Sequence, residues 1–195
     1  SDVYKRQETL IEREKQGLGL TRPELSVLVA YGKMVLKEQL VADEIANDEF
    51  HGKQLVAYFP SELRRNYKEQ MVNHPLRAEI IATALANQMV NEMGCNFVTR
   101  LQEETGASVV DIANAYSATR EIFELEGILK QTRALDNVAT AEAQYEIMFY
   151  VRRALRRISR WLLRNRSGKS TVAELVAVYK DCLLYTSPSP RDIGE

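Results

Sequence analysis

The sequence predicts an all-α fold, a multi-helix array or bundle of amphipathic helices. Apolar residues recur at helical spacing along most of the 195 residues. Capping residues, glycines and prolines separate these stretches at short intervals. No run of β-branched residues alternates with a period of two, as a half-buried strand would require. Amphipathic helices of this kind bury their apolar faces against one another.

The first part of the chain is predicted to hold one long helix. Residues 8–16 are expected to be the charged end of an upstream helix, and residues 17–20 a linker. Thr21 and Glu24 have the spacing of a capping box, and Pro23 is tolerated in a first turn. We therefore expect a helix from this point to about residue 40, followed by a polar connector over residues 41–48.

Shorter helices are predicted in the middle of the chain. Residues 51–59 form a short helix ended by Pro60, and Ser61 is expected to cap a helix with Leu63, Tyr67, Met71 and Val72 on one side. His74 and Pro75 end that helix. The next helices are expected over residues 76–93, stopped by Gly94, and over residues 96–105, stopped by Gly106.

Four further helices complete the prediction. Ser108, with Asp111 three residues on, is expected to cap a helix that ends near residue 123. A shorter helix over residues 125–135 precedes a turn at Asp136 and Asn137. The longest periodic segment covers residues 140–166, and Thr171 with Glu174 opens a final helix over residues 172–180.

Both ends of the chain are expected to lie outside the native sequence. Residues 1–7 are similar to the translated mosaic end of a tagmentation sequencing adaptor, and residues 182–192 to the reverse complement of the opposite adaptor. We therefore expect residues 1–7 and 182–195 to be irregular, adaptor-derived tails. The native stretch would be an internal slice of a longer protein, with an upstream helix end and linker at 8–20 and a truncated helical domain at 21–181.

Composition limits the partners and the compartment. The formal net charge is -1, and removing the two tails leaves it unchanged, so no global charge attracts nucleic acid or an anionic membrane. No apolar run approaches the roughly 20 residues of a membrane span. With Cys182 in a tail, Cys95 is a lone cysteine, which fits a reducing, cytoplasmic compartment.

Two glycine-containing segments resemble phosphate-binding motifs in part. Residues 17–20, Gly-Leu-Gly-Leu, follow a charged helix rather than a strand and lack a third glycine. Residues 167–171, Ser-Gly-Lys-Ser-Thr, lack the upstream glycine of a P-loop. Because a phosphate loop needs strand, turn and helix in that order, we interpret the first as a linker and the second as an exposed turn.

No residue is predicted to be catalytic, to bind a cofactor or to bind a metal. His51 and His74 have no ligand partner at metal-binding spacing, and His74 is expected to hydrogen-bond a last-turn carbonyl. Cys95 has no neighbouring base and is expected to be a small packing residue. Glu103 and Glu104 point about 100° apart on a helix and are interpreted as surface charge.

A polar stripe is formed by Thr83, Asn87 and Asn91, which lie four residues apart on an otherwise apolar helix. Buried amides need partners, so we interpret the stripe as a structural network that ties this helix to neighbouring loops. Contact with a ligand is the alternative.

An arginine stripe runs along the longest helix. Its six members are Arg152, Arg153, Arg156, Arg157, Arg160 and Arg164. Such a stripe could bind phosphate, but charge runs are usually solvated or paired, and the chain as a whole is not basic. We therefore predict a helix-packing or subunit-docking face in preference to nucleic-acid binding. Carboxylates are available at Glu103, Glu104, Glu121, Glu124 and Glu126.

Several sequence blocks, in this order and spacing, resemble the region after the catalytic core of the large bacterial NAD-specific glutamate dehydrogenases. The resemblance covers nearly all of residues 8–181. The blocks lie at residues 20–33, 58–60 with Leu63, 74–83, 86–87, 90–91, 103–107, 120–123, 135–137 and 161–165.

This resemblance implies a non-catalytic helical domain of an enzyme of glutamate catabolism. The family oxidises L-glutamate with NAD and water to 2-oxoglutarate, ammonia and NADH, and its members are large cytoplasmic homo-oligomers. Its substrate lysines and its NAD-binding loop lie upstream, so Lys33 is not taken for a catalytic lysine, and we expect this chain alone to bind no NAD and to be inactive.

The expected partners are the catalytic core of the same chain and other subunits, and the separated piece should expose apolar surface. The alternative is a free-standing helical adaptor that binds an acidic partner or RNA through the arginine-rich helix.

Overall fold

The computed structural model describes residues 2–168 and 170–185, and these residues contain helices and no strand. The all-α prediction is thus confirmed for the described part of the chain. The α-helices are α1 Asp2–Lys15, α2 Arg22–Ala42, α3 Gly52–Tyr58, α4 Ser61–Asn66, α5 Lys68–Val72, α6 Arg77–Met93, α7 Asn96–Thr105, α8 Val109–Ile122, α9 Leu125–Ala134, α10 Ala141–Asn165 and α11 Val172–Tyr185, with 3-10 turns η1 Ile45–Asn47 and η2 Glu49–His51.

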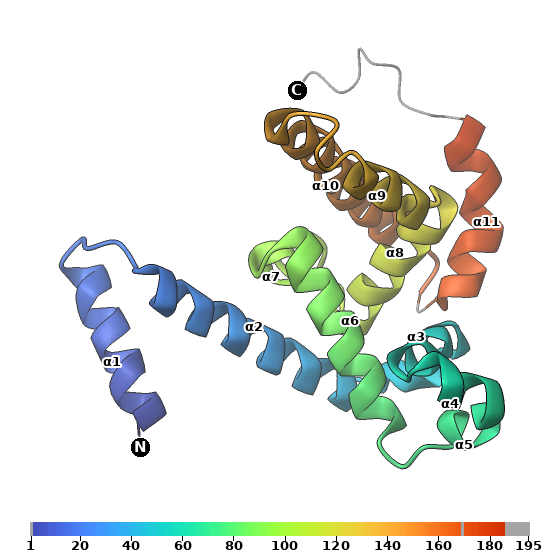
Figure 1. Cartoon of the computed structure of the whole chain (residues 1–195), viewed down its shortest axis with the longest axis horizontal. Helices are drawn as coiled ribbons and strands as arrows, with labels where there is room; N and C mark the ends of the chain where they lie inside the picture. Colours follow the sequence, from blue (N-terminus) through green and yellow to red (C-terminus); the bar gives the residue numbers. More distant parts are fainter. Residues whose placement is uncertain (1, 169, 186–195) are drawn as a thin grey trace.

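Helix α8 lies at the centre of the molecule. It packs against α10 and α11, which lie on different sides of it, and also contacts α2 and α7 (Figure 1). Eleven of its 14 residues are buried. Ala113, Ala115 and Ala118 are completely buried, and their small side chains allow the neighbouring helices to approach closely. The many small and apolar residues of this helix allow it to be buried, although polar residues stand among them.

Helices α2 and α6 cross and form the second part of the core (Figure 1). The C-terminal half of α2 packs on α6 through Leu36 and Leu40, which are buried. The N-terminal half of α2 extends beyond α6, and α1 lies at its far end, away from α8 and α11. The core therefore holds only one end of α2.

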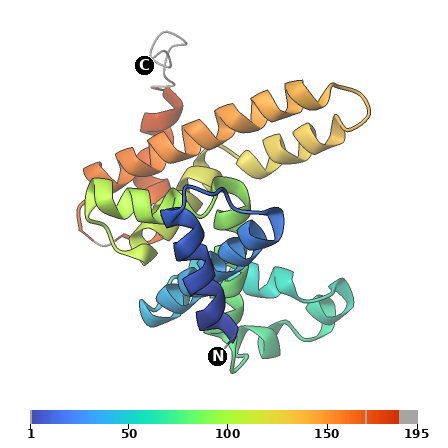
Figure 2. The same cartoon turned by 90° about the vertical axis from the view of Figure 1, so that its left-hand side faces the viewer.

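Helices α9 and α10 form a hairpin whose tip projects from the body (Figure 2). The turn between them contains Asn137 in the left-handed region, with φ 64°, as the predicted Asp136–Asn137 turn allows. The buried residues of α10 are Leu155, Ser159, Leu162 and Leu163, all in its second half. The first half of α10 is thus packed mainly on α9.

Most predicted helix ends are confirmed. Thr21 and Glu24 form both halves of a capping box, and the Thr171 N–H donates to Glu174 Oε2 at 2.8 Å. The Ser108 hydroxyl accepts from the Asp111 N–H at 3.2 Å. Gly94 and Gly106 end α6 and α7 with φ of 86° and 68°, where a side chain would strain the backbone.

The polar connector predicted over residues 41–48 is wrong. Helix α2 continues to Ala42, and η1 follows at once. Ile45 is completely buried, Ala46 and Asp48 are nearly so, and the Ala46 carbonyl accepts from the Arg77 guanidinium at 2.6 Å. The segment is short and polar in composition, but it lies across the core, where its few apolar side chains are covered by α6.

The helix predicted to be capped by Ser61 also differs from the one in the structure. Pro60 precedes the helix and Ser61 is its first residue, without a side-chain capping bond. The helix breaks at Tyr67, whose φ of -132° is not helical, so α4 and α5 are separate turns. Met71 is buried there, whereas Leu63, Tyr67 and Val72 are exposed. With one buried contact, the segment has too little packing to hold a continuous helix.

The tails predicted to be irregular are helical where the structure describes them. Residues 2–7 belong to α1 and residues 182–185 to α11. Neither stretch contains proline or glycine, so a helix that has formed next to it extends through it at little cost. Residues 1 and 186–195 of the predicted tails lie outside the described residues.

Candidate functional site

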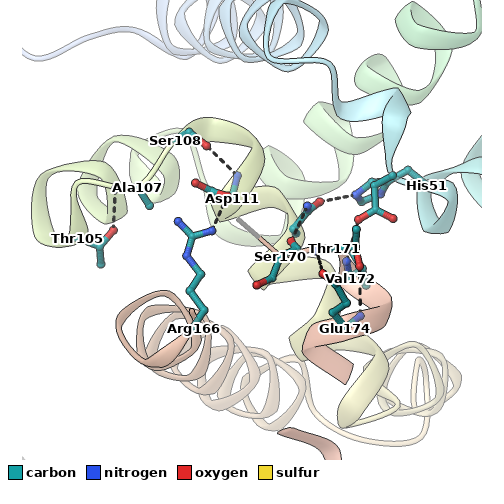
Figure 3. Close-up of polar contacts among 12 residues, drawn as sticks. His51, Thr105, Ala107, Ser108, Asp111, Arg166, Ser170, Thr171, Val172 and Glu174 are labelled. Atoms are coloured by element: carbon teal, nitrogen blue, oxygen red, sulfur yellow. Dashed lines mark hydrogen bonds and ion pairs between the residues drawn. The ribbon is translucent and has the colours of Figure 1, made fainter. Parts of the chain in front are cut away.

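A buried polar junction joins the start of α11 to α8 and to the segment before α3 (Figure 3). His51 is completely buried, and its Nε2 lies 2.9 Å from Asn114 Oδ1. The Asn114 amide in turn donates to the Ser170 carbonyl at 3.2 Å. Because Asn114 Oδ1 can only accept, the proton of His51 lies on Nε2, and the buried Nδ1 has no partner among the described residues.

Burial holds the pKa of His51 below its ordinary value. The hydrogen bond to Asn114 and the nearby Asp48 act in the opposite direction but do not outweigh burial. His51 is therefore neutral at pH 7, and its role in this geometry is to hold Asn114 rather than to transfer a proton.

Asp48 links two helix starts. Its Oδ1 accepts from the Phe50 N–H at 3.0 Å and its Oδ2 from the Val172 N–H at 2.8 Å. The first bond caps η2, and the second satisfies an otherwise unpaired N–H in the first turn of α11. One carboxylate thus connects segments 124 residues apart.

Asp111 makes the second connection at this junction. Arg166, just after α10, forms an ion pair with its carboxylate, as Figure 3 shows. Burial alone would raise the pKa of Asp111, but hydrogen bonds from Arg166 and Ser108 outweigh it, so the pKa lies below its ordinary value. Asp111 thus combines the expected interaction with Ser108 and this ion pair.

The hollow beside the junction has a volume of about 650 Å³ and an acidic lining. Two of its carboxylates, Asp48 and Asp111, are already engaged by the backbone and by Arg166. Among the described residues, no group of three or more His, Cys, Asp or Glu side chains is placed to hold a metal ion. The junction therefore has the geometry of a structural tie rather than of a reaction centre.

A second buried cluster surrounds Arg120 on α8. Its guanidinium pairs with Glu92 on α6 and, at 2.7 Å, with Glu126 on α9. The Tyr116 hydroxyl donates to the same Glu92 at 2.5 Å. Burial, and then the charge of Glu92, raise the pKa of Tyr116 well above its usual range, so the phenol stays a donor.

The predicted polar stripe lies near this cluster but does not join it. Thr83 and Asn87 are half-buried and Asn91 is exposed. The Thr83 hydroxyl donates to the Glu79 carbonyl of its own helix at 2.6 Å. Within the described residues, no side-chain hydrogen bond links the three to another element, so the predicted network has no bond to support it. The polar ties of α6 come instead from Glu92 and Arg77.

The arginine stripe of α10 divides into two parts. At its end, Arg160 pairs with Glu104 of α7 at 3.3 Å, and Arg164 donates to the Glu104 carbonyl at 3.4 Å. Of the expected carboxylates, Glu121 pairs with Lys53 and Glu126 with Arg120 instead. This end of the stripe packs α10 on α7, as one of the two predicted roles requires.

The other part of the stripe lines a pocket of about 740 Å³ at the beginning of α7. Arg100 of α7 joins it there. None of the described residues that line the pocket is acidic. They are Met93, Gly94, Cys95, Asn96, Phe97, Arg100, Phe149, Arg152, Arg153, Arg156 and Arg157.

Other residues considered in the sequence have local roles. Gly19 lies in the turn between α1 and α2, where its carbonyl accepts from Arg13 at 3.1 Å. His74 Nδ1 accepts from the Leu76 N–H at 3.1 Å, so the expected bond to a carbonyl is wrong: the ring lies at a helix start, not at a helix end. Cys95 is exposed rather than packed, although a Cβ on Gly32 would lie 3.5 Å from its sulfur.

The turn between α10 and α11 contains Ser167 and Gly168 of the segment compared with a P-loop, and it follows a helix. Lys169 of that segment lies outside the described residues. Along the described stretches of the chain, no helix combines the length and the apolar character that a membrane span requires.

The residues that form the two buried clusters were not predicted from the sequence. Asp48, Asn114 and Arg120 stand in polar or mixed surroundings, and each has a partner far along the chain, 124, 63 and 28 residues away respectively. No local spacing indicates such pairs. The one available signal was a helix, residues 109–122, whose polar residues occur on every side, which indicates that some must be buried and paired.

Known proteins resemble this chain over most of its length. A family model described as "Glutamate dehydrogenase, C-terminal" matches residues 17–186. The NAD-specific glutamate dehydrogenase of Halomonas elongata is 44% identical over 96% of this chain and 11% of its own length. Those of Pseudomonas aeruginosa and Mycobacterium tuberculosis are 39% and 34% identical, over 87% and 80% of this chain and 10% of their own lengths.

The chain thus spans about a tenth of the length of these relatives. The identities are well above the level at which similarity could be accidental, and the family model covers nearly all of the described helices. On this evidence, the chain belongs to the glutamate dehydrogenase C-terminal family.

Proposed function

We propose that this chain is the C-terminal helical part of an NAD-dependent glutamate dehydrogenase. The parent enzyme would convert L-glutamate, NAD and water into 2-oxoglutarate, ammonia and NADH. The names of the three relatives support this reaction, and their length supports a parent about ten times longer than the chain.

The chain itself contributes no catalytic group in this proposal. A dinucleotide site needs a strand, a glycine-rich turn and a helix, and the described residues around Gly17 and Gly19 are helix, turn and helix. The residues present therefore do not fit NAD, and we assign NAD and glutamate binding to the rest of the parent.

The proposed role of this domain is to dock on the parent through α2, and one apolar stripe carries the proposal. Residues 25, 28, 29, 32, 36 and 40 lie on one side of the helix. At the C-terminal end of the stripe, Leu36 and Leu40 are buried by α6. At its N-terminal end, Leu25, Leu28 and Val29 are exposed.

A continuous stripe that is covered over only half its length indicates a missing partner for the other half. Covering the three exposed aliphatic side chains would add about 2–3 kcal/mol, because each still shows roughly two fifths of its surface to water. This chain spans about a tenth of the length of its relatives. We therefore take the rest of the parent enzyme as the partner that covers the exposed end of the stripe.

We further propose that the parent is a cytoplasmic homo-oligomer. Cys95, the lone cysteine of residues 8–181, forms no disulfide, which supports a reducing compartment. Exposed aromatic residues near the hairpin tip, Tyr145 and Tyr150, support a contact with another subunit.

The docking face is tested in the full-length dehydrogenase that carries this domain. Leu25→Glu places a charge on the exposed end of the stripe in a helix that tolerates Glu. Met34→Glu is the matched control, because Met34 is 55% exposed, against 48% for Leu25, but lies on the opposite side of α2. We expect Leu25→Glu to lower glutamate-dependent NAD reduction or release subunits, and Met34→Glu to do neither.

Two results would contradict the proposal. Equal behaviour of both variants and the wild-type enzyme would show that α2 does not dock. Reduction of NAD by the purified 195-residue chain with glutamate would show that the domain is catalytic. If the reading frame upstream encodes no dehydrogenase core, the free-standing adaptor is the correct interpretation.

A further inference from the structure

The arginine pocket at the beginning of α7 has an unusual charge. Arg100 comes from α7, and Arg152, Arg153, Arg156 and Arg157 come from α10. None of the described residues that line the pocket is acidic, and among the described residues no carboxylate lies within 4.0 Å of the guanidiniums of Arg100, Arg152 or Arg156. Guanidinium groups stay charged at any physiological pH.

The positive charges of Arg100, Arg152 and Arg156 around one hollow repel one another, and the folded chain must bear that cost. An anion bound between them removes the repulsion and gains charge-assisted hydrogen bonds. A single negative charge would offset only one of these three positive charges, so the pocket favours a ligand with several negative charges.

The donor geometry favours phosphate. The planar guanidinium presents paired N–H groups that match two oxygens of one phosphate, and arginines on two helices can approach it from different sides. The pocket also contains the start of α7, where Cys95 provides no side-chain cap. The backbone N–H groups of that turn and the helix dipole add to the attraction for an anion.

The volume of the pocket and the ring of Phe149 indicate what the ligand contains besides phosphate. A volume of about 740 Å³ exceeds that of a bare phosphate and lies in the range of small-molecule sites. Phe149 lies at the edge with 60% of its surface exposed, where a planar base could stack on it.

An extended polyanion such as RNA fits less well. A backbone track needs positive charge along its length, but the next arginines of α10, Arg160 and Arg164, are already engaged by Glu104. At the other end, Glu142 and Glu146 lie beside Arg152 in an adjoining hollow. Arg152 and Arg156, which have no carboxylate partner among the described residues, are thus confined with Arg100 to one pocket.

We propose that this pocket binds a small phosphate-bearing polyanion of the size of a nucleoside diphosphate. The site is formed by this domain alone and does not depend on the docking of α2.

Calorimetric titration of the 195-residue chain with pyrophosphate and with ADP tests the proposal. Both probes should bind saturably, at one site per chain, in physiological salt. The double variant Arg100→Gln/Arg156→Gln should weaken both by about tenfold for each arginine removed. Phe149→Leu should weaken ADP and leave pyrophosphate unchanged.

The matched control is Arg160→Gln/Arg164→Gln, which removes the same charge from the same helix outside the pocket. It should retain wild-type affinity within about threefold. Circular dichroism establishes that each variant is folded, and Arg100→Lys/Arg156→Lys, which keeps the charge but loses the paired donors, should give intermediate affinity.

Absence of saturable binding by the wild-type chain would overturn the proposal, as would equal losses in the two double variants. Tighter binding of a single-stranded RNA or an acidic peptide that pyrophosphate does not displace would overturn it in favour of a macromolecular partner.

Discussion

Arg120 is held by two carboxylates that differ in their exposure to water. The side chain of Glu92 is 14% exposed and that of Glu126 is 73% exposed. Removing a charge from a buried pair leaves its partner uncompensated, whereas an exposed pair is screened by water. The two contacts of this one guanidinium should therefore contribute unequally.

We predict that Glu92→Gln lowers the free energy of unfolding by about 2–4 kcal/mol. Glu126→Gln, which removes the same charge from the same arginine, should cost less than about 1 kcal/mol. Urea unfolding followed by circular dichroism measures both. Equal losses of unfolding free energy in the two variants would show that Arg120 is less buried than it is in the structure.

His51 should make stability depend on pH. Its folded pKa is below its unfolded value of about 6.5, so between these two values the unfolded chain binds a proton that the folded chain does not. The contribution of His51 to stability is therefore complete above about pH 6.5 and is lost as the pH falls towards the folded pKa. Asp48 is the charged group nearby.

We predict that the urea midpoint falls between about pH 7.5 and pH 5.5, and that His51→Gln flattens this dependence while keeping an amide donor for Asn114. An unchanged slope in His51→Gln would assign the pH dependence to other groups.

Helix ends were predictable from the sequence because their chemistry is local. Thr21 with Glu24, Ser108 and Thr171 with Glu174 each bond within three or four residues, so spacing alone identifies them. The break at Tyr67 was not predictable, because no glycine or proline marks it and only weak packing causes it.

Substitution of two exposed glycines by alanine should change the stability of the protein in opposite directions. Gly106 ends α7 with φ 68°, a conformation that strains any side chain, and Gly127 lies in the first turn of α9 with open space where a Cβ would be. We predict that Gly106→Ala destabilises by about 1 kcal/mol and that Gly127→Ala stabilises by about 0.5–1 kcal/mol. Thermal unfolding measures both, and shifts of the same sign would contradict the assigned backbone conformations.

The arrangement of the helices was not predictable at the scale of the whole molecule. Periodicity identifies an apolar face but not the helix that covers it. The stripe of α2 illustrates this limit: the sequence gives Leu25 and Leu36 the same character, yet one is exposed and the other buried. The arginine stripe is divided in the same way, because the position of α7 alone decides which arginines meet Glu104 and which line the pocket.

Asp48 is the residue through which distant parts of the fold should be coupled. Asp48→Ala removes the acceptor of the Val172 N–H, which is buried, and that of the Phe50 N–H. We predict a loss of about 2–3 kcal/mol, since two helix starts lose their caps at once. Amide hydrogen exchange should accelerate together in η2 and in the first turn of α11, 124 residues away.

Thr171→Ala is the matched control, because it removes a hydroxyl that caps only α11. It should accelerate exchange at the start of α11 and leave η2 unchanged. The tip of the α9–α10 hairpin, which does not touch Asp48, should keep its exchange rates in both variants. If Asp48→Ala accelerates exchange in η2 alone, α11 is held by its apolar contacts through Val172 and Leu175, which are both buried, and the carboxylate is not the tie.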